Sequence, residues 1–123
     1  MATIFIIDDS PTDVRVFSTL LERAGHQVLS VGTAEEGIER VPIEMPDLII
    51  MDVIMPGMNG FQATRTLSRD PVTTKIPIVM ITTKSMETDR VWGIRQGARA
   101  FITKPVNEKE LLACINELLS SPT

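Results

Sequence analysis

Five short apolar runs, rich in Val, Ile and Met, recur along the chain. They cover residues 3–7, 27–31, 48–51, 76–81 and 98–103. Most of these runs are continuously apolar rather than alternating, which is typical of strands that are buried on both faces. The pattern therefore predicts a parallel sheet with helices covering both of its faces.

The segments between the runs carry signals for the start of helices. Ser10 offers a capping hydroxyl just before Pro11, Asp13 adds an acid to the first turn, and Gly25 suits the end of that helix. The later signals are Thr33 with Glu36, Asn59 with Gly60, residues 85–96 as a fourth helix, and Asn107 with Glu110. A strand followed by a helix thus repeats five times. Right-handed crossovers then predict a ligand site beyond the carboxyl ends of the strands.

The length and charge of the chain narrow the classes of function. A chain of 123 residues with 43% hydrophobic residues fits one domain with a sizeable core. The formal net charge of −4 argues against a nucleic-acid-binding surface, which needs clustered Lys and Arg. We therefore expect protein partners rather than nucleic acid, and a monomer.

Neither a targeting segment nor a disulfide is expected. The chain starts with a strand-like run, and no apolar stretch approaches the roughly 18 residues that a membrane-spanning helix needs. The single cysteine, Cys114, falls in a helical pattern of apolar residues and is expected to be a buried, unreactive thiol. The sequence therefore predicts a cytoplasmic protein that does not enter membranes.

Polar residues that can do chemistry stand at the ends of four predicted strands. They are Asp8 and Asp9 after the first strand, Asp52 after the third, Thr82 and Thr83 at the fourth, and Lys104 after the fifth. Because these strand ends share one edge of a parallel sheet, the carboxylates would raise one another's pKa values unless a cation compensated them. Oxygen ligands select a hard ion, so we expect Mg²⁺.

Each of these residues also has an ordinary structural explanation. The acids after the first strand could cap the first helix, and Asp52 could begin a turn. Lys104 could be a solvated surface lysine, and the two threonines could simply be strand formers. Ser10 already supplies the helix cap, however, and the convergence of the strand ends favours a shared site.

Four motifs, taken in their order along the chain, resemble the receiver domain of bacterial response regulators. They are DDS at residues 8–10, MDVIMPGMNG at 51–60, ITT at 81–83 and FITKP at 101–105. Each motif is weak by itself, but their order at successive strand ends is specific. The resemblance spans residues 1–123 as one receiver domain. It implies a doubly wound, CheY-like and flavodoxin-like α/β fold whose five-stranded parallel sheet has the order 2-1-3-4-5, with five helices.

By this resemblance Asp52 is the phospho-acceptor of a response regulator. Asp9 and Asp52 would bind Mg²⁺ together with the backbone carbonyl of Ile54, and Asp8 would help through a water molecule. The protein would catalyse its own phosphorylation and dephosphorylation only, and would not be an enzyme that acts on other substrates. The transfer needs positive charge to offset the charge that accumulates on the phosphoryl oxygens.

The resemblance also implies a conformational switch. Lys104 would pair with the phosphoryl oxygens, Thr82 would move to hydrogen-bond them, and Phe101 would turn inward when Thr82 moves. Phe101 lacks the hydroxyl that Tyr often brings to this position, so only the packing part of the switch would operate. The fourth helix and the fifth strand are the expected moving parts, since a phosphoryl group adds about −1.5 to −2 charges. The bond between Lys104 and Pro105 is expected to be cis.

A narrower resemblance indicates the pathway. The segments KSMETDRVWGIRQGARAFITKPV and GFQATRTL are similar to the PilH-type regulators of twitching motility. This resemblance implies a chemotaxis-type histidine kinase as the phosphate donor and a downstream protein target on the face of the fourth helix, fifth strand and fifth helix. Trp92 is then either a core anchor or a part of the docking surface.

Other functions share parts of the pattern. A phosphatase of the haloacid dehalogenase type also uses a strand-end aspartate with Mg²⁺, but its nucleophile normally belongs to a DxD arrangement, which Asp52 lacks. A flavodoxin-like redox carrier shares the fold and the length, but no Ser/Thr-rich phosphate loop follows the first strand. Within the receiver class, a fragment of a larger regulator and a phosphate-sink protein of another chemosensory pathway stay open.

Overall fold

The computed structural model describes residues 1–120, which form alternating strands and helices. The elements are β1 (Thr3–Ile7), α1 (Pro11–Arg23), β2 (Gln27–Val31), α2 (Ala34–Glu44), β3 (Leu48–Met51), α3 (Gly60–Arg69), β4 (Ile78–Thr82), α4 (Glu87–Gln96), β5 (Ala100–Thr103) and α5 (Glu108–Ser120). The strands pair in the order β2-β1-β3-β4-β5, and every pair is parallel. The predicted fold class, a doubly wound five-stranded parallel sheet with five helices, is confirmed.

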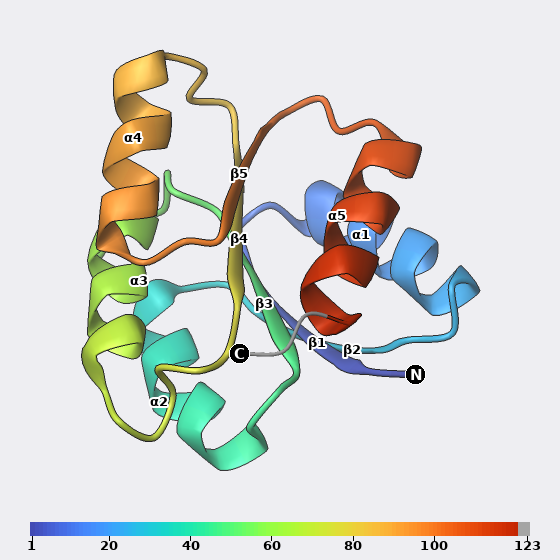
Figure 1. Ribbon diagram of the computed structural model, residues 1–123, viewed down its shortest axis with the longest axis horizontal. Helices are drawn as coiled ribbons and strands as arrows, with labels where there is room; N and C mark the ends of the chain where they lie inside the picture. The colour runs from blue at the N-terminus through green and yellow to red at the C-terminus, as the bar shows by residue number, and fades with distance from the viewer. Residues whose placement is uncertain (121–123) are drawn as a thin grey trace.

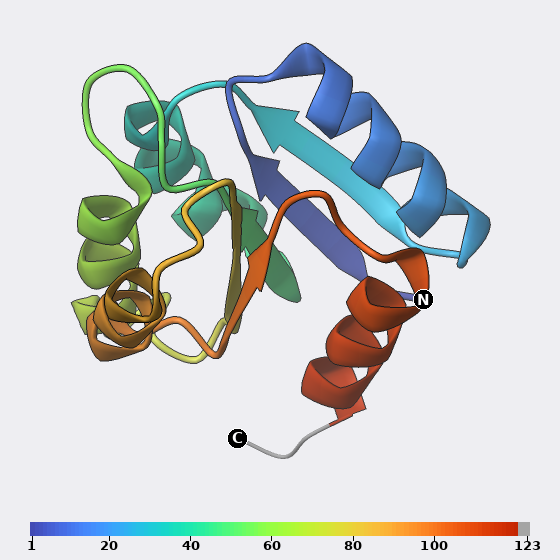
Figure 2. The same ribbon diagram turned by 90° about the horizontal axis from the view of Figure 1, so that it is seen from above.

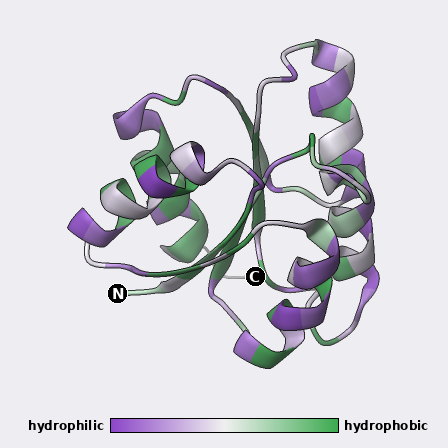
Figure 3. Ribbon diagram, turned by 180° about the vertical axis from the view of Figure 1, so that it is seen from behind, coloured by the Kyte–Doolittle hydropathy of each residue, from purple (hydrophilic) through white to green (hydrophobic). Residues whose placement is uncertain are grey.

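The sheet separates two layers of helices (Figure 1). Helices α1 and α5 cover one face, and α2, α3 and α4 cover the other, as the view from above shows (Figure 2). Each face has its own core because successive strand residues point to opposite sides. Phe5 and Ile7 of β1 belong to the core under α2 and α3, whereas Ile4 and Ile6 belong to the core under α1 and α5. This double burial explains the hydrophobic strands that run between the helices in Figure 3.

Helices α1, α2 and α5 begin where the sequence predicts a cap. Ser10 accepts a hydrogen bond from the backbone N–H of Asp13 at 3.2 Å, and Thr33 accepts one from Glu36 at 3.1 Å. Asn107 does the same for Glu110 at 3.1 Å. Each cap satisfies a backbone N–H that has no partner inside its helix. These three helix starts are therefore set by local chemistry.

Three elements begin later than the sequence pattern predicts, namely β4 at Ile78, β5 at Ala100 and α4 at Glu87. Ile76 belongs to the preceding turn because its N–H donates to the carbonyl of Thr73 at 3.0 Å. Ala98 belongs to the end of α4 because its N–H donates to the carbonyl of Gly93 at 3.1 Å. The apolar pattern therefore predicts β4 and β5 to start two residues too early. Those residues are apolar, but their backbone N–H groups bond to the preceding turn or helix and not to the sheet.

Two side chains differ in burial from the simplest expectation. Cys114 is half-buried rather than buried, and burial, with the charges of Glu117 and Glu110, raises the pKa of its thiol. Trp92 is 48% exposed on α4, so it is not a core anchor.

Among residues 1–120, no helix combines the length and the apolar character that crossing a bilayer would require.

Candidate functional site

The site lies at the carboxyl edge of the sheet, where strand order reverses around β1. Ile7 and Met51 are register partners in β1 and β3, so the residues that follow them leave the sheet side by side. The backbone N–H of Asp52 donates to the carbonyl of Ile7 at 2.9 Å. Open parallel sheets bind ligands at such a switch point, and the two acidic strand ends meet here as the sequence predicts.

Three carboxylates form a cluster at this edge. One oxygen each from Asp8, Asp9 and Asp52 lies within 4.8 Å of the others, and no second His, Cys or acid cluster of this kind occurs in residues 1–120. Asp8 and Asp52 are 2% and 6% exposed, whereas Asp9 is exposed. The backbone N–H of Ser10 donates to Asp8 at 2.9 Å and helps to fix that side chain.

The carboxyl group of Asp52 has a raised pKa. Burial is the largest cause, and the charge of Asp8 adds to it. The charge of Lys104 and the backbone N–H groups of Ile54 and Val53 act in the opposite direction without cancelling the effect. Asp52 is thus a desolvated carboxylate that a further positive charge would stabilise.

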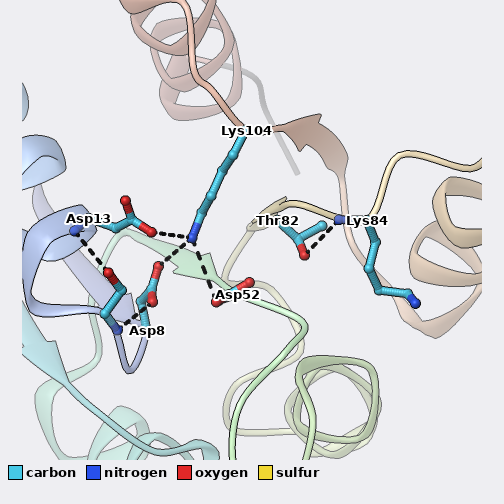
Figure 4. Close-up of polar contacts among 7 residues, drawn as sticks. Asp8, Asp13, Asp52, Thr82, Lys84 and Lys104 are labelled. Carbon is cyan, nitrogen blue, oxygen red and sulfur yellow. Dashed lines mark hydrogen bonds and ion pairs between the residues drawn. The ribbon is translucent and has the colours of Figure 1, made fainter.

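Lys104 reaches this cluster from the end of β5. Its ammonium group lies 2.6 Å from Asp13, 3.2 Å from Asp8 and 3.7 Å from Asp52 (Figure 4). Burial by itself would lower the pKa of Lys104, but the hydrogen bond to Asp13 and the charges of Asp52 and Asp8 outweigh it and raise the pKa. The Lys104–Pro105 peptide bond is cis, as expected.

The two predicted hydroxyl groups have different surroundings. Thr82 is fully buried at the end of β4, and its hydroxyl oxygen accepts a hydrogen bond from the backbone N–H of Lys84 at 3.3 Å. Thr83 is exposed. Phe101 on β5 is half-buried, and its ring lies against Gly93, where an added Cβ would come within 3.1 Å of it. Thr82 therefore faces the interior at the strand end, and Phe101 fills the space under α4.

Two contributors to the site were not recognised from the sequence. The sequence pattern explains Asp13 only as a first-turn acid, yet this residue makes the shortest contact of Lys104. Its place in the first turn of a helix that starts at Pro11, two residues after Asp9, is the signal that could locate it at this edge. Glu35 of α2 accepts a hydrogen bond from the backbone N–H of Met58 at 3.2 Å and so holds the loop after Asp52.

The donor set fits a hard divalent cation. All three acids of the cluster offer carboxylate oxygens, and Mg²⁺ takes a few such oxygens together with water molecules. Two of these acids are buried and repel each other, so a cation would relieve an unfavourable charge. Asp8, Asp9 and Asp52 are therefore the residues that could hold a metal ion.

The chain belongs to the response regulator receiver domain family, which it matches over residues 4–116. Protein PilH of Pseudomonas aeruginosa is 51% identical to it over 120 residues, covering 98% of this chain and 99% of PilH. The response regulator PleD of Caulobacter vibrioides is 35% identical, and the match covers 95% of this chain but 26% of PleD. A crystal structure of a CheY-like receiver domain protein from Methanospirillum hungatei superposes with a TM-score of 0.89 at 28% identity, covering 97% of this chain and 94% of that one. Two-component signalling is thus the general function of this class of chain.

Proposed function

We propose that this chain is a single-domain response regulator that is phosphorylated on Asp52 and controls type IV pilus twitching motility. The donor is a histidine kinase of the chemotaxis type, and the protein works in the cytoplasm. The similarity to PilH along nearly the whole of both chains supports the choice of pathway. The receiver family supports the phosphoryl transfer.

One observation carries the proposal. Asp52 is buried beside a cationic side chain, with the ammonium group of Lys104 at 3.7 Å, and its carboxylate belongs to an acid cluster that fits a cation. A carboxylate in such surroundings is positioned for attack on phosphorus. The positive charge of Lys104 and of the cation would stabilise the negative charge that accumulates on the phosphoryl oxygens during the transfer. Neither feature is needed for a residue that only begins a turn.

The chemistry assigns a role to each side chain. A carboxylate oxygen of Asp52 attacks phosphorus, and the bond from phosphorus to the donor histidine nitrogen breaks with its electron pair staying on that nitrogen. Mg²⁺ held by Asp9, Asp52 and the carbonyl of Ile54, with Asp8 acting through water, would supply positive charge to the phosphoryl oxygens. Lys104 donates hydrogen bonds to the same oxygens. Positioning and electrostatics, rather than a separate acid or base, thus provide the catalysis.

The phosphoryl group then acts on the β4–α4 side of the molecule. Thr82 leaves the backbone N–H of Lys84 and donates to a phosphoryl oxygen, and Phe101 turns further into the space that opens under α4. Helix α4 exposes Val91, Trp92 and Ile94, which are between 40% and 48% exposed. We propose that the surface of α4, β5 and α5 carries the output to a protein target.

The test is transfer from a small phosphodonor. Wild type, Asp52→Asn and Asp47→Asn are incubated with acetyl phosphate and Mg²⁺, and intact mass is measured together with Trp92 fluorescence. Asp47 precedes the other end of the same strand and accepts a hydrogen bond from the backbone N–H of Thr3 at 2.8 Å, so it is a matched control. We expect a gain of one phosphoryl group in wild type and Asp47→Asn only. A gain in Asp52→Asn, or none in wild type, contradicts the proposal.

A further inference from the structure

The ammonium group of Lys104 is shared by three carboxylates, and one of them lies outside the acid cluster. The distances are 2.6 Å to Asp13, 3.2 Å to Asp8 and 3.7 Å to Asp52, so the shortest contact goes to the residue that has no part in the candidate metal site. A lysine ammonium has three N–H donors and no more. Two of these donors hydrogen-bond Asp13 and Asp8, and the contact with Asp52 at 3.7 Å is an ion pair, so at most one donor is available to an arriving phosphoryl group while both bonds hold.

We propose that Asp13 is a positioning residue that holds Lys104 in the resting protein and competes with the phosphoryl group for its ammonium. The inference rests on the function proposed above. Asp13 would thereby limit how tightly the site binds a phosphoryl-like anion. Its effect reaches the reaction through Lys104 and not through contact with the reacting atoms.

Competition follows from the number of donors. A phosphoryl group on Asp52 presents several strong acceptor oxygens, and once Lys104 directs more than one N–H toward them, Asp13 or Asp8 loses its hydrogen bond. The negative charge of Asp13 also lies near the place where negative charge accumulates, so it opposes the anion directly. Both effects act in the same direction.

Asp13 is the partner that Lys104 can release most easily. The side chain of Asp8 is 1% exposed, so it would be left desolvated without its cationic partner, whereas the side chain of Asp13 is 35% exposed and can be hydrated instead. Asp13 also lies in the first turn of α1, where a carboxylate is favourable without an ion pair. The resting contact is therefore strong enough to place Lys104 and weak enough to be exchanged.

The substitution Asp13→Asn separates charge from position. The amide oxygen still accepts a hydrogen bond from Lys104, but the competing negative charge is gone. The probe is beryllofluoride, a phosphoryl mimic, titrated calorimetrically at saturating Mg²⁺. We expect Asp13→Asn to bind beryllofluoride about two- to fivefold more tightly than wild type, the range that a partly exposed ion pair supports. Affinity for Mg²⁺ alone should not increase.

Two further variants serve as controls. Glu22→Gln removes one negative charge from the exposed face of the same helix and should leave beryllofluoride affinity unchanged. Asp13→Glu keeps the charge and should stay close to wild type. The inference is overturned if Asp13→Asn binds beryllofluoride no more tightly than wild type does. If Asp13 were merely structural, its substitution would weaken the binding of both beryllofluoride and Mg²⁺. Failure of wild type itself to bind beryllofluoride overturns the proposed function instead.

Discussion

Two neighbouring segments leave the acidic edge of the sheet and differ in how firmly they are held. The β3–α3 segment follows Asp52, and α3 buries Gly60, Ala63, Thr64 and Leu67. The β4–α4 segment follows Thr82, and Gly93 is the one buried residue of α4. The two helices lie beside each other on the same face of the sheet (Figure 2).

Their starts differ as well. Asn59 and Gln62 form a reciprocal capping box at α3, with hydrogen bonds of 3.0 and 3.1 Å. At α4 the capping position is Met86, which brings no side-chain oxygen, and the carboxylate of Asp89 alone reaches back to its backbone N–H at 3.3 Å. Because local stability follows buried contacts and satisfied backbone groups, α4 is the helix that a small change in free energy can displace. Asp52, the proposed phospho-acceptor, is thus followed by a firmly held segment, and the proposed output helix α4 is held less firmly.

The largest expected effect comes from truncating one apolar side chain in each of the two helices. Leu67 is 2% exposed, so we expect Leu67→Ala to lower the free energy of unfolding by about 2–5 kcal/mol. Trp92 is 48% exposed, and Trp92→Ala should lower it by about 1 kcal/mol or less despite the larger side chain. Urea denaturation measures both. Equal losses would show that α4 is held as firmly as α3.

A matched pair of glycines gives the next largest effect. A Cβ at Gly60 would collide with the backbone carbonyl of Asp52, so we expect Gly60→Ala to destabilise by about 1–3 kcal/mol or more. A Cβ at Gly93 would meet the side chain of Met80 at 2.7 Å and that of Phe101 at 3.1 Å, which can move. The higher helix propensity of Ala, about 1 kcal/mol, offsets part of that strain. The denaturation midpoint of Gly93→Ala should therefore stay nearer to that of wild type.

The caps offer a smaller effect with opposite signs in the two helices. Asn59→Ala should lower the free energy of unfolding by about 1 kcal/mol, since it removes a cap that α3 uses. Met86→Ser adds a capping hydroxyl to α4 and should raise the stability of that helix by up to about 1 kcal/mol. Amide hydrogen exchange in α4 measures the second effect locally. No gain in protection there would mean that α4 is not limited by its start.

The smallest expected effect concerns the pH dependence of Asp52. Because its pKa in the folded protein is raised above the ordinary value of 3.8, the folded state holds this proton more readily than the unfolded chain. Without Mg²⁺, the free energy of unfolding of wild type therefore falls as pH rises from 3.8 through the raised pKa of Asp52. The stability lost in this range is not regained at neutral pH. Asp52→Asn should be the more stable protein at neutral pH, and the difference should vanish in acid. Thermal melts across pH measure it, and a less stable variant at neutral pH would contradict the raised pKa.

Much of the site could be predicted because its members stand at strand ends. The apolar runs place Asp8, Asp9, Asp52 and Lys104 at strand ends, and these residues do meet in space. Asp13 was missed because an acid in the first turn of a helix already has a sufficient local explanation. The sequence left open whether Trp92 is buried or exposed, because its exposure depends on how much of α4 is covered by the sheet and by α3.

The sequence by itself determined the order of strands and helices, the start of most helices, and which side chains follow the carboxyl ends of the strands. These properties are local, since caps, apolar runs and crossover handedness depend on residues close together in the chain. Tertiary structure alone decided which acid holds Lys104, since Asp13 lies 91 residues away in the chain, and how loosely α4 rests on the sheet. Both depend on distances between segments that only the packed fold brings together, and sequence spacing does not record those distances.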